Sequence, residues 1–140
     1  MPVPGALPYL FVIEDNQGDK DLMLEAFRAV FPADELTCID DGEEALGELK
    51  KNHQNYELVI LDLNLPRKDG LEILRSIRRD HRVRTLPVVV LTTSRWQTDH
   101  DASQLLEADA SFIKPSLFPH YLELIKSIKS VADKKTQENS

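Results

Sequence analysis

The chain has 140 residues, of which 41% are hydrophobic and 29% charged, and its formal net charge is −7. These values are typical of one folded domain and exclude a mainly disordered chain. The negative charge argues against binding to nucleic acid through phosphate contacts and favours protein partners or metal ions. The N-terminus lacks the basic start of a signal peptide, and no apolar run is long enough to cross a membrane. With a single cysteine, Cys38, no internal disulfide is possible, so we expect a cytoplasmic protein without a membrane anchor.

Short apolar runs alternate with helical stripes along the whole chain. The runs predict five buried strands at 9–13, 36–39, 58–61, 88–91 and 110–113. Apolar residues at helical spacing predict five helices at 19–31, 43–51, 71–79, 97–106 and 119–132, followed by a polar, frayed tail at 133–140. This alternation indicates an α/β fold, a doubly wound five-stranded parallel sheet with helices on both faces.

The stretch 58–70, LVILDLNLPRKDG, is the most informative part of the sequence. Its apolar start predicts a strand buried on both faces, and the strand ends in Asp62. Pro66 and Gly70 then indicate a turn. An acid at the carboxyl end of a parallel strand lies where open α/β sheets bind their ligands. A lone acid of this kind more often caps the next helix, so the functional interpretation depends on neighbouring groups.

Polar residues follow the other predicted strands as well. The carboxyl ends of parallel strands share one edge of the sheet, which brings together Glu14, Asp15, Asp62, Thr92 and Lys114. Clustered carboxylates need neutralising charge, and Mg²⁺ suits an open site of two carboxylates and water. A carboxylate nucleophile, a metal ion, a lysine and a hydroxyl form a set suited to phosphoryl transfer.

These motifs in this order resemble the receiver domain of two-component response regulators, over residues 7–132. The carriers of the resemblance are Glu14-Asp15, the LDLNLPRKDG run, Leu91-Thr92 and Lys114-Pro115. More narrowly, EDNQGDKDL and PVVVLTTS resemble the single-domain regulators that serve bacterial phytochrome histidine kinases. The resemblance implies a flavodoxin-like (βα)5 fold with short tails at 1–6 and 133–140 and no output domain.

The resemblance also implies a role for each site residue. Asp62 is the expected phosphoacceptor, receiving its phosphoryl group from a sensor histidine kinase, for which the narrower resemblance implies the phytochrome type. The expected Mg²⁺ ligands are Asp15, Asp62 and the backbone carbonyl of Asn64, with Glu14 acting through water. Lys114 is expected to pair with the phosphoryl oxygens and Thr92 to hydrogen-bond them.

One position departs from the family pattern. Receivers usually carry a switch aromatic three residues before the lysine, and here that residue is Ser111. Phe112 follows it and is expected to face the other side of the sheet, because side chains alternate along a strand. This position therefore argues against the usual threonine–aromatic switch.

The pattern leaves alternatives to a signalling module that is not itself an enzyme. An aspartyl-nucleophile phosphatase needs a second acid two residues after Asp62, where this chain has Asn64. A degenerate receiver used as a scaffold would not need all five site residues. We further expect a homodimer built on the fourth helix, fifth strand and last helix, with an apolar patch of Phe112, Phe118, Tyr121 and Leu122.

Overall fold

The computed structural model describes residues 8–12, 17–31, 35–63, 70–92 and 108–138. Five parallel strands form one sheet in the order β2-β1-β3-β4-β5. The strands are β1 (Pro8–Val12), β2 (Glu35–Ile39), β3 (Leu58–Asp62), β4 (Val88–Thr92) and β5 (Ala110–Ile113). The predicted doubly wound parallel sheet is confirmed, and each strand lies within a residue or so of its predicted range.

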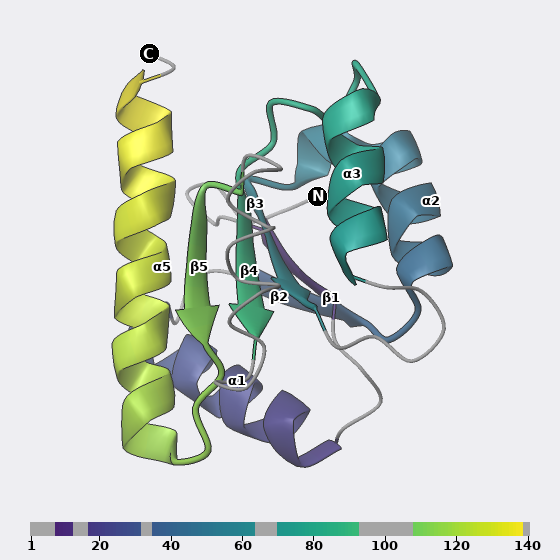
Figure 1. Cartoon of the computed structure of the whole chain (residues 1–140). Helices are drawn as coiled ribbons and strands as arrows, with labels where there is room; N and C mark the ends of the chain where they lie inside the picture. Colours follow the sequence, from purple (N-terminus) through teal and green to yellow (C-terminus); the bar gives the residue numbers. More distant parts are fainter. Residues whose placement is uncertain (1–7, 13–16, 32–34, 64–69, 93–107, 139–140) are drawn as a thin grey trace.

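Four long helices cover the sheet in the described residues. They are α1 (Gln17–Val30), α2 (Gly42–Asn52), α3 (Gly70–Arg79) and α5 (Phe118–Glu138), and a short 3-10 turn, η1 (His53–Asn55), follows α2. α1 and α5 lie on one side of the sheet, and α2 and α3 on the other (Figure 1). The helix predicted at 97–106 lies outside the described residues. None of the described helices is both long and apolar enough to span a membrane.

The two faces of the sheet contribute alternate residues to two hydrophobic clusters. Leu58 and Ile60 of β3 pack toward α1 and α5, whereas Val59 and Leu61 pack toward α2 and α3. Every residue of β3 and β4 is buried, as expected for central strands of a parallel sheet covered on both faces. This packing fixes the position of Asp62 at the carboxyl end of β3.

Helix boundaries follow local chemistry. α2 begins after Asp41, whose carboxylate accepts a hydrogen bond from the backbone N–H of Glu43 at 2.8 Å, as an N-cap residue does. α5 continues to Glu138, so the predicted frayed tail is wrong as far as that residue. The segment after Ala132 contains neither Gly nor Pro and is rich in Lys, Gln and Glu, which favour helix.

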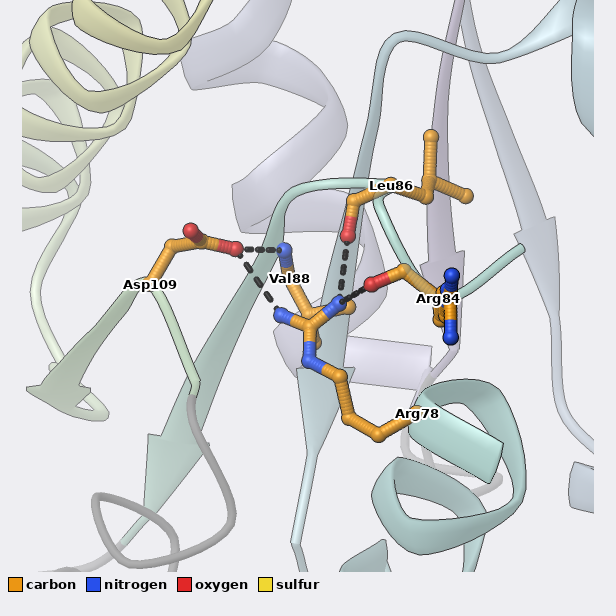
Figure 2. A network of polar contacts seen from close by, with 5 residues as sticks. All are labelled: Arg78, Arg84, Leu86, Val88 and Asp109. Carbon is orange, nitrogen blue, oxygen red and sulfur yellow. Dashed lines mark hydrogen bonds and ion pairs between the residues drawn. The ribbon is translucent and has the colours of Figure 1, made fainter. Parts of the chain in front are cut away.

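An ion pair ties α3 to the start of β4 and β5 at the edge of the sheet where these strands begin (Figure 2). Arg78 donates to the carbonyls of Arg84 and Leu86 at 2.9 and 2.8 Å and to Asp109 at 3.0 Å. The same Asp109 oxygen accepts the Val88 N–H at 2.7 Å. The other arginines between residues 75 and 84 are exposed, whereas the Arg78 side chain is only 15% exposed.

Candidate functional site

Asp62 is the last residue of β3 and is completely buried. The strand continues its ladder past this residue, because the Leu63 N–H donates to the Leu91 carbonyl at 2.9 Å. A buried carboxylate is costly unless it is paired and hydrogen-bonded. The position therefore requires a cationic partner.

Lys114 provides that cation, as the sequence predicts for this edge of the sheet. Its Nζ lies 2.7 Å from Asp62 Oδ2, and its backbone N–H donates to the Thr92 carbonyl at 2.7 Å. Burial by itself lowers the pKa of the Lys114 ammonium, but hydrogen bonds and charge attraction from two carboxylates outweigh it, so the pKa of Lys114 is raised. The lysine is held in its charged form against Asp62.

The second carboxylate is that of Asp19, in the first turn of α1, which the sequence prediction missed as a site residue. Its Oδ2 lies 2.9 Å from Lys114 Nζ, and the side chain is 22% exposed. Its Oδ1 accepts a hydrogen bond from the hydroxyl of Tyr121 at 3.4 Å. Asp19 belongs to the EDNQGDKDL run, so its position was visible, but helix periodicity marked it only as the start of a helix.

Thr92 ends β4 and is fully buried beside the same edge. Asp62 pairs in register with Leu91, and Thr92 with Ile113, so the ends of β3, β4 and β5 meet. Three predicted site residues, Asp62, Thr92 and Lys114, are thus brought together. The ends of these neighbouring strands therefore carry a buried carboxylate, a cation and a hydroxyl.

Gly70 allows α3 to begin directly beneath this edge. A Cβ on Gly70 would lie 2.5 Å from the Leu63 Cα and 2.9 Å from the Asp62 carbonyl oxygen. The Gly70 N–H also donates to the Leu63 carbonyl at 3.3 Å. The close backbone approach explains the glycine at this position, whereas the predicted turn before it lies outside the described residues.

The remaining predicted metal ligands, Glu14, Asp15 and Asn64, lie outside the described residues. Within the described part of the chain there is no group of three His, Cys, Asp or Glu side chains that could hold a metal ion. Asp62 itself fits a hard cation, because a carboxylate has two oxygens with about four lone-pair sites and Lys114 contacts one oxygen. The donor set present is therefore compatible with Mg²⁺ at Asp62.

The predicted alternation in β5 is confirmed. Ser111 is paired with Val90, on the α2–α3 side of the sheet, whereas Phe112 is paired with Leu91 and packs into the cluster of α1 and α5. By the same alternation Thr92 belongs to the side of Ser111, where no aromatic residue occupies the usual switch position. Asp62 belongs to the other side, toward α1 and α5.

Comparison with known proteins gives a consistent result. Residues 10–126 match the profile of the response regulator receiver domain. The chain is 32% identical over 126 residues to the response regulator Rcp1 of Synechocystis sp., with 86% of each protein covered. Its fold is similar to that of a phosphorylated cyanobacterial phytochrome response regulator, RcpA, with a TM-score of 0.78, 33% identity and coverage of 89% of this chain and 92% of the other.

A second structural neighbour is the bacteriophytochrome response regulator AtBRR, with a TM-score of 0.70 and 36% identity. The similarity covers 88% of this chain and 92% of AtBRR. A structure of Rcp1 with bound Mn²⁺ is also similar, with a TM-score of 0.74, 31% identity and coverage of 87% and 91%.

Proposed function

Because the chain belongs to the response regulator receiver domain family, we propose that it accepts a phosphoryl group on Asp62 with the help of Mg²⁺. The observation that carries the proposal is the fully buried Asp62 carboxylate, held 2.7 Å from Lys114 at the carboxyl edge of the sheet. A buried acid with a fixed cation is a costly arrangement that a purely structural site does not need. A cation fixed beside the carboxylate suits a reaction that brings a negatively charged group, such as a phosphoryl group, to the site.

In the proposed reaction an Asp62 carboxylate oxygen attacks the phosphorus of a kinase phosphohistidine. A P–O bond forms, the P–N bond breaks, and the leaving imidazole nitrogen takes the electron pair and then a proton. Bound Mg²⁺ would neutralise the phosphoryl oxygens, with Asp15, Asp62, the Asn64 carbonyl and water-linked Glu14 holding it. Lys114 then pairs with the transferred phosphoryl oxygens, and Thr92 donates a hydrogen bond to one of them.

The test is the intact mass of the protein after incubation with Mg²⁺ and acetyl phosphate. The wild type is expected to gain one phosphoryl group, and Asp62→Asn none, because an amide is a poor nucleophile. Asp133→Asn, at an exposed position of α5, is the matched control and is expected to behave like the wild type. Stoichiometric phosphorylation of Asp62→Asn would refute the assignment.

The kinase partner is inferred from the neighbours. RcpA and AtBRR are described as phytochrome and bacteriophytochrome response regulators, and the chain resembles both over nearly their whole lengths. We therefore propose a sensor histidine kinase of the phytochrome type as donor. Phosphotransfer from a purified bacteriophytochrome kinase should be faster than from a kinase with an unrelated sensor, and equal rates would count against this partner.

The homodimer through the fourth helix, β5 and α5 remains a proposal, and its apolar patch needs correction. Tyr121 is 1% exposed and belongs to the core, and Phe112, Phe118 and Leu122 are partly buried against that core. The large apolar side chains exposed in the described residues are instead Ile113 and Leu117, each 58% exposed, at the end of β5 and just before α5.

Sedimentation at micromolar concentration, with and without phosphorylation, tests the dimer. Ile113→Asp with Leu117→Asp should dissociate it, because a charge replaces apolar contact area in each subunit. Wild-type monomers in both states would exclude the dimer. A dimer that survives both substitutions would place the interface on another face.

A further inference from the structure

Four side chains form a continuous series of polar contacts from the site to α5 on one side of the sheet. Asp62 contacts Lys114 at 2.7 Å, Lys114 contacts Asp19 at 2.9 Å, and the Tyr121 hydroxyl donates to Asp19 at 3.4 Å. This series of contacts joins the end of β3, the segment after β5, the start of α1 and the start of α5. It connects elements that are far apart in the sequence.

Lys114 is shared between two carboxylates in this chain. Because the two carboxylates share one ammonium group, a change of charge on Asp62 changes the attraction between Lys114 and Asp19. Phosphorylation would replace the single negative charge of Asp62 with about −1.5 to −2 and add three acceptor oxygens. These oxygens extend beyond the present carboxylate and attract the lysine away from Asp19.

Asp19 would then be left with less compensating charge in a half-buried position. The Tyr121 hydroxyl also donates to Asp19, and its 3.4 Å hydrogen bond is long and has room to shorten. A hydrogen bond to a carboxylate strengthens as other donors withdraw, since the charge remains to be satisfied. Tyr121 is buried in the core stripe of α5, so a change at its hydroxyl is carried by the helix.

The electrostatics of Tyr121 agree with this coupling. The pKa of its phenol is raised, first by burial, then by the charge and hydrogen bond of Asp19, and also by the charge of Asp62. The negative charges of both carboxylates therefore act on the Tyr121 phenol.

The usual aromatic reporter is missing from the other side of the sheet, where Ser111 shares a face with Thr92. We propose that Asp19 is a positioning residue for Lys114, and that Asp19 and Tyr121 transmit phosphorylation of Asp62 to the first turns of α5. The signal thus leaves the site on the α1–α5 side. This inference rests on the proposed phosphorylation of Asp62 and adds the route by which it is read.

Amide hydrogen exchange with intact-mass measurement on the same samples tests the route. In the wild type, phosphorylation with Mg²⁺ and acetyl phosphate should slow exchange at residues 118–125 by about fivefold, as a strengthened charge-assisted hydrogen bond would. In Tyr121→Phe the protein should still be phosphorylated, but this ratio should fall to about one. Asp19→Asn should lose the ratio as well, because the amide carries no charge to be left uncompensated.

Tyr56→Phe is the matched control. It removes another tyrosine hydroxyl, which donates to Glu48 at 3.0 Å next to α2, on the opposite side of the sheet. This variant should keep the fivefold ratio. Comparing each variant with and without phosphate separates coupling from simple destabilisation of α5, which would speed exchange equally in both states.

The outcomes are distinct. A phosphorylated Tyr121→Phe protein that keeps the wild-type ratio overturns the route while leaving the phosphoacceptor assignment intact. A wild-type protein that gains no phosphoryl mass overturns the proposed function and the route together.

Discussion

Removal of the Asp109 carboxylate should destabilise the domain strongly without touching the proposed phosphorylation site. One oxygen of Asp109 accepts both the Val88 N–H at 2.7 Å and the Arg78 guanidinium at 3.0 Å (Figure 2). Asp109→Ala leaves the Val88 N–H unsatisfied at the start of a buried strand, at a cost of about 1–3 kcal/mol. It also takes the counterion from Arg78.

The second contribution is smaller than the 3–5 kcal/mol found when a fully buried pair is broken. The two side chains are 15% and 10% exposed, and Arg78 keeps its bonds to the carbonyls of Arg84 and Leu86. With about 1 kcal/mol for this loss, the total is roughly 3 kcal/mol, or a fall in Tm of about 10 °C. Asp109→Asn keeps an acceptor for Val88 and should cost only about 1–1.5 kcal/mol.

Urea unfolding followed by circular dichroism measures these differences. Arg79→Met is a control, because Arg79 is the exposed neighbour of Arg78 on α3 and its loss should cost less than about 0.5 kcal/mol. The reasoning is refuted if Asp109→Ala unfolds within 0.5 kcal/mol of the wild type. It is also refuted if Asp109→Ala and Asp109→Asn are equally destabilised, since the Val88 hydrogen bond would then contribute nothing.

Three further perturbations have defined outcomes. Gly70→Ala should lower the free energy of unfolding by about 1–3 kcal/mol in urea titrations, because its Cβ would lie 2.5 Å from the Leu63 Cα. Gly47→Ala is the control and should raise the free energy of unfolding by up to about 1 kcal/mol, because a Cβ there has no atom within 4 Å. Lys114→Met should retain Mg²⁺ affinity in calorimetric titration while losing the α5 response, and an affinity loss as large as that of Asp62→Asn would contradict its role as a cation. The pKa of Tyr121 is raised, so its contribution to stability is complete below pH 10 and is lost as the pH rises further. Tyr121→Phe should therefore lose less stability than the wild type between pH 9 and about pH 11. Parallel curves of stability against pH would contradict this.

The fold could be predicted from the sequence because apolar runs mark the strands and apolar residues at helical spacing mark the helices. Apolar runs such as 88–91 predicted the buried strands, and the parallel direction of the strands predicted that Asp62, Thr92 and Lys114 lie at one edge of the sheet. Asp19 and Asp109 were not predicted in their present roles, since both depend on side chains from distant elements. An acid in the first turn of a helix or before a strand has an adequate local explanation, and only the folded chain shows which cation it meets.

The long reach of the site in sequence has a consequence for synthesis on the ribosome. Asp62 and Lys114 are 52 residues apart, so the buried acid is translated well before its cation. At about 5–20 residues per second, the nascent chain waits roughly 3–10 s for that charge. During this interval β3 lacks the lysine that contacts Asp62 in the folded chain, so we expect stable closure of the sheet to follow the emergence of β5 and that lysine. A chain interrupted before that lysine would remain open and exposed to proteases, and only finished molecules would persist long enough to receive a signal.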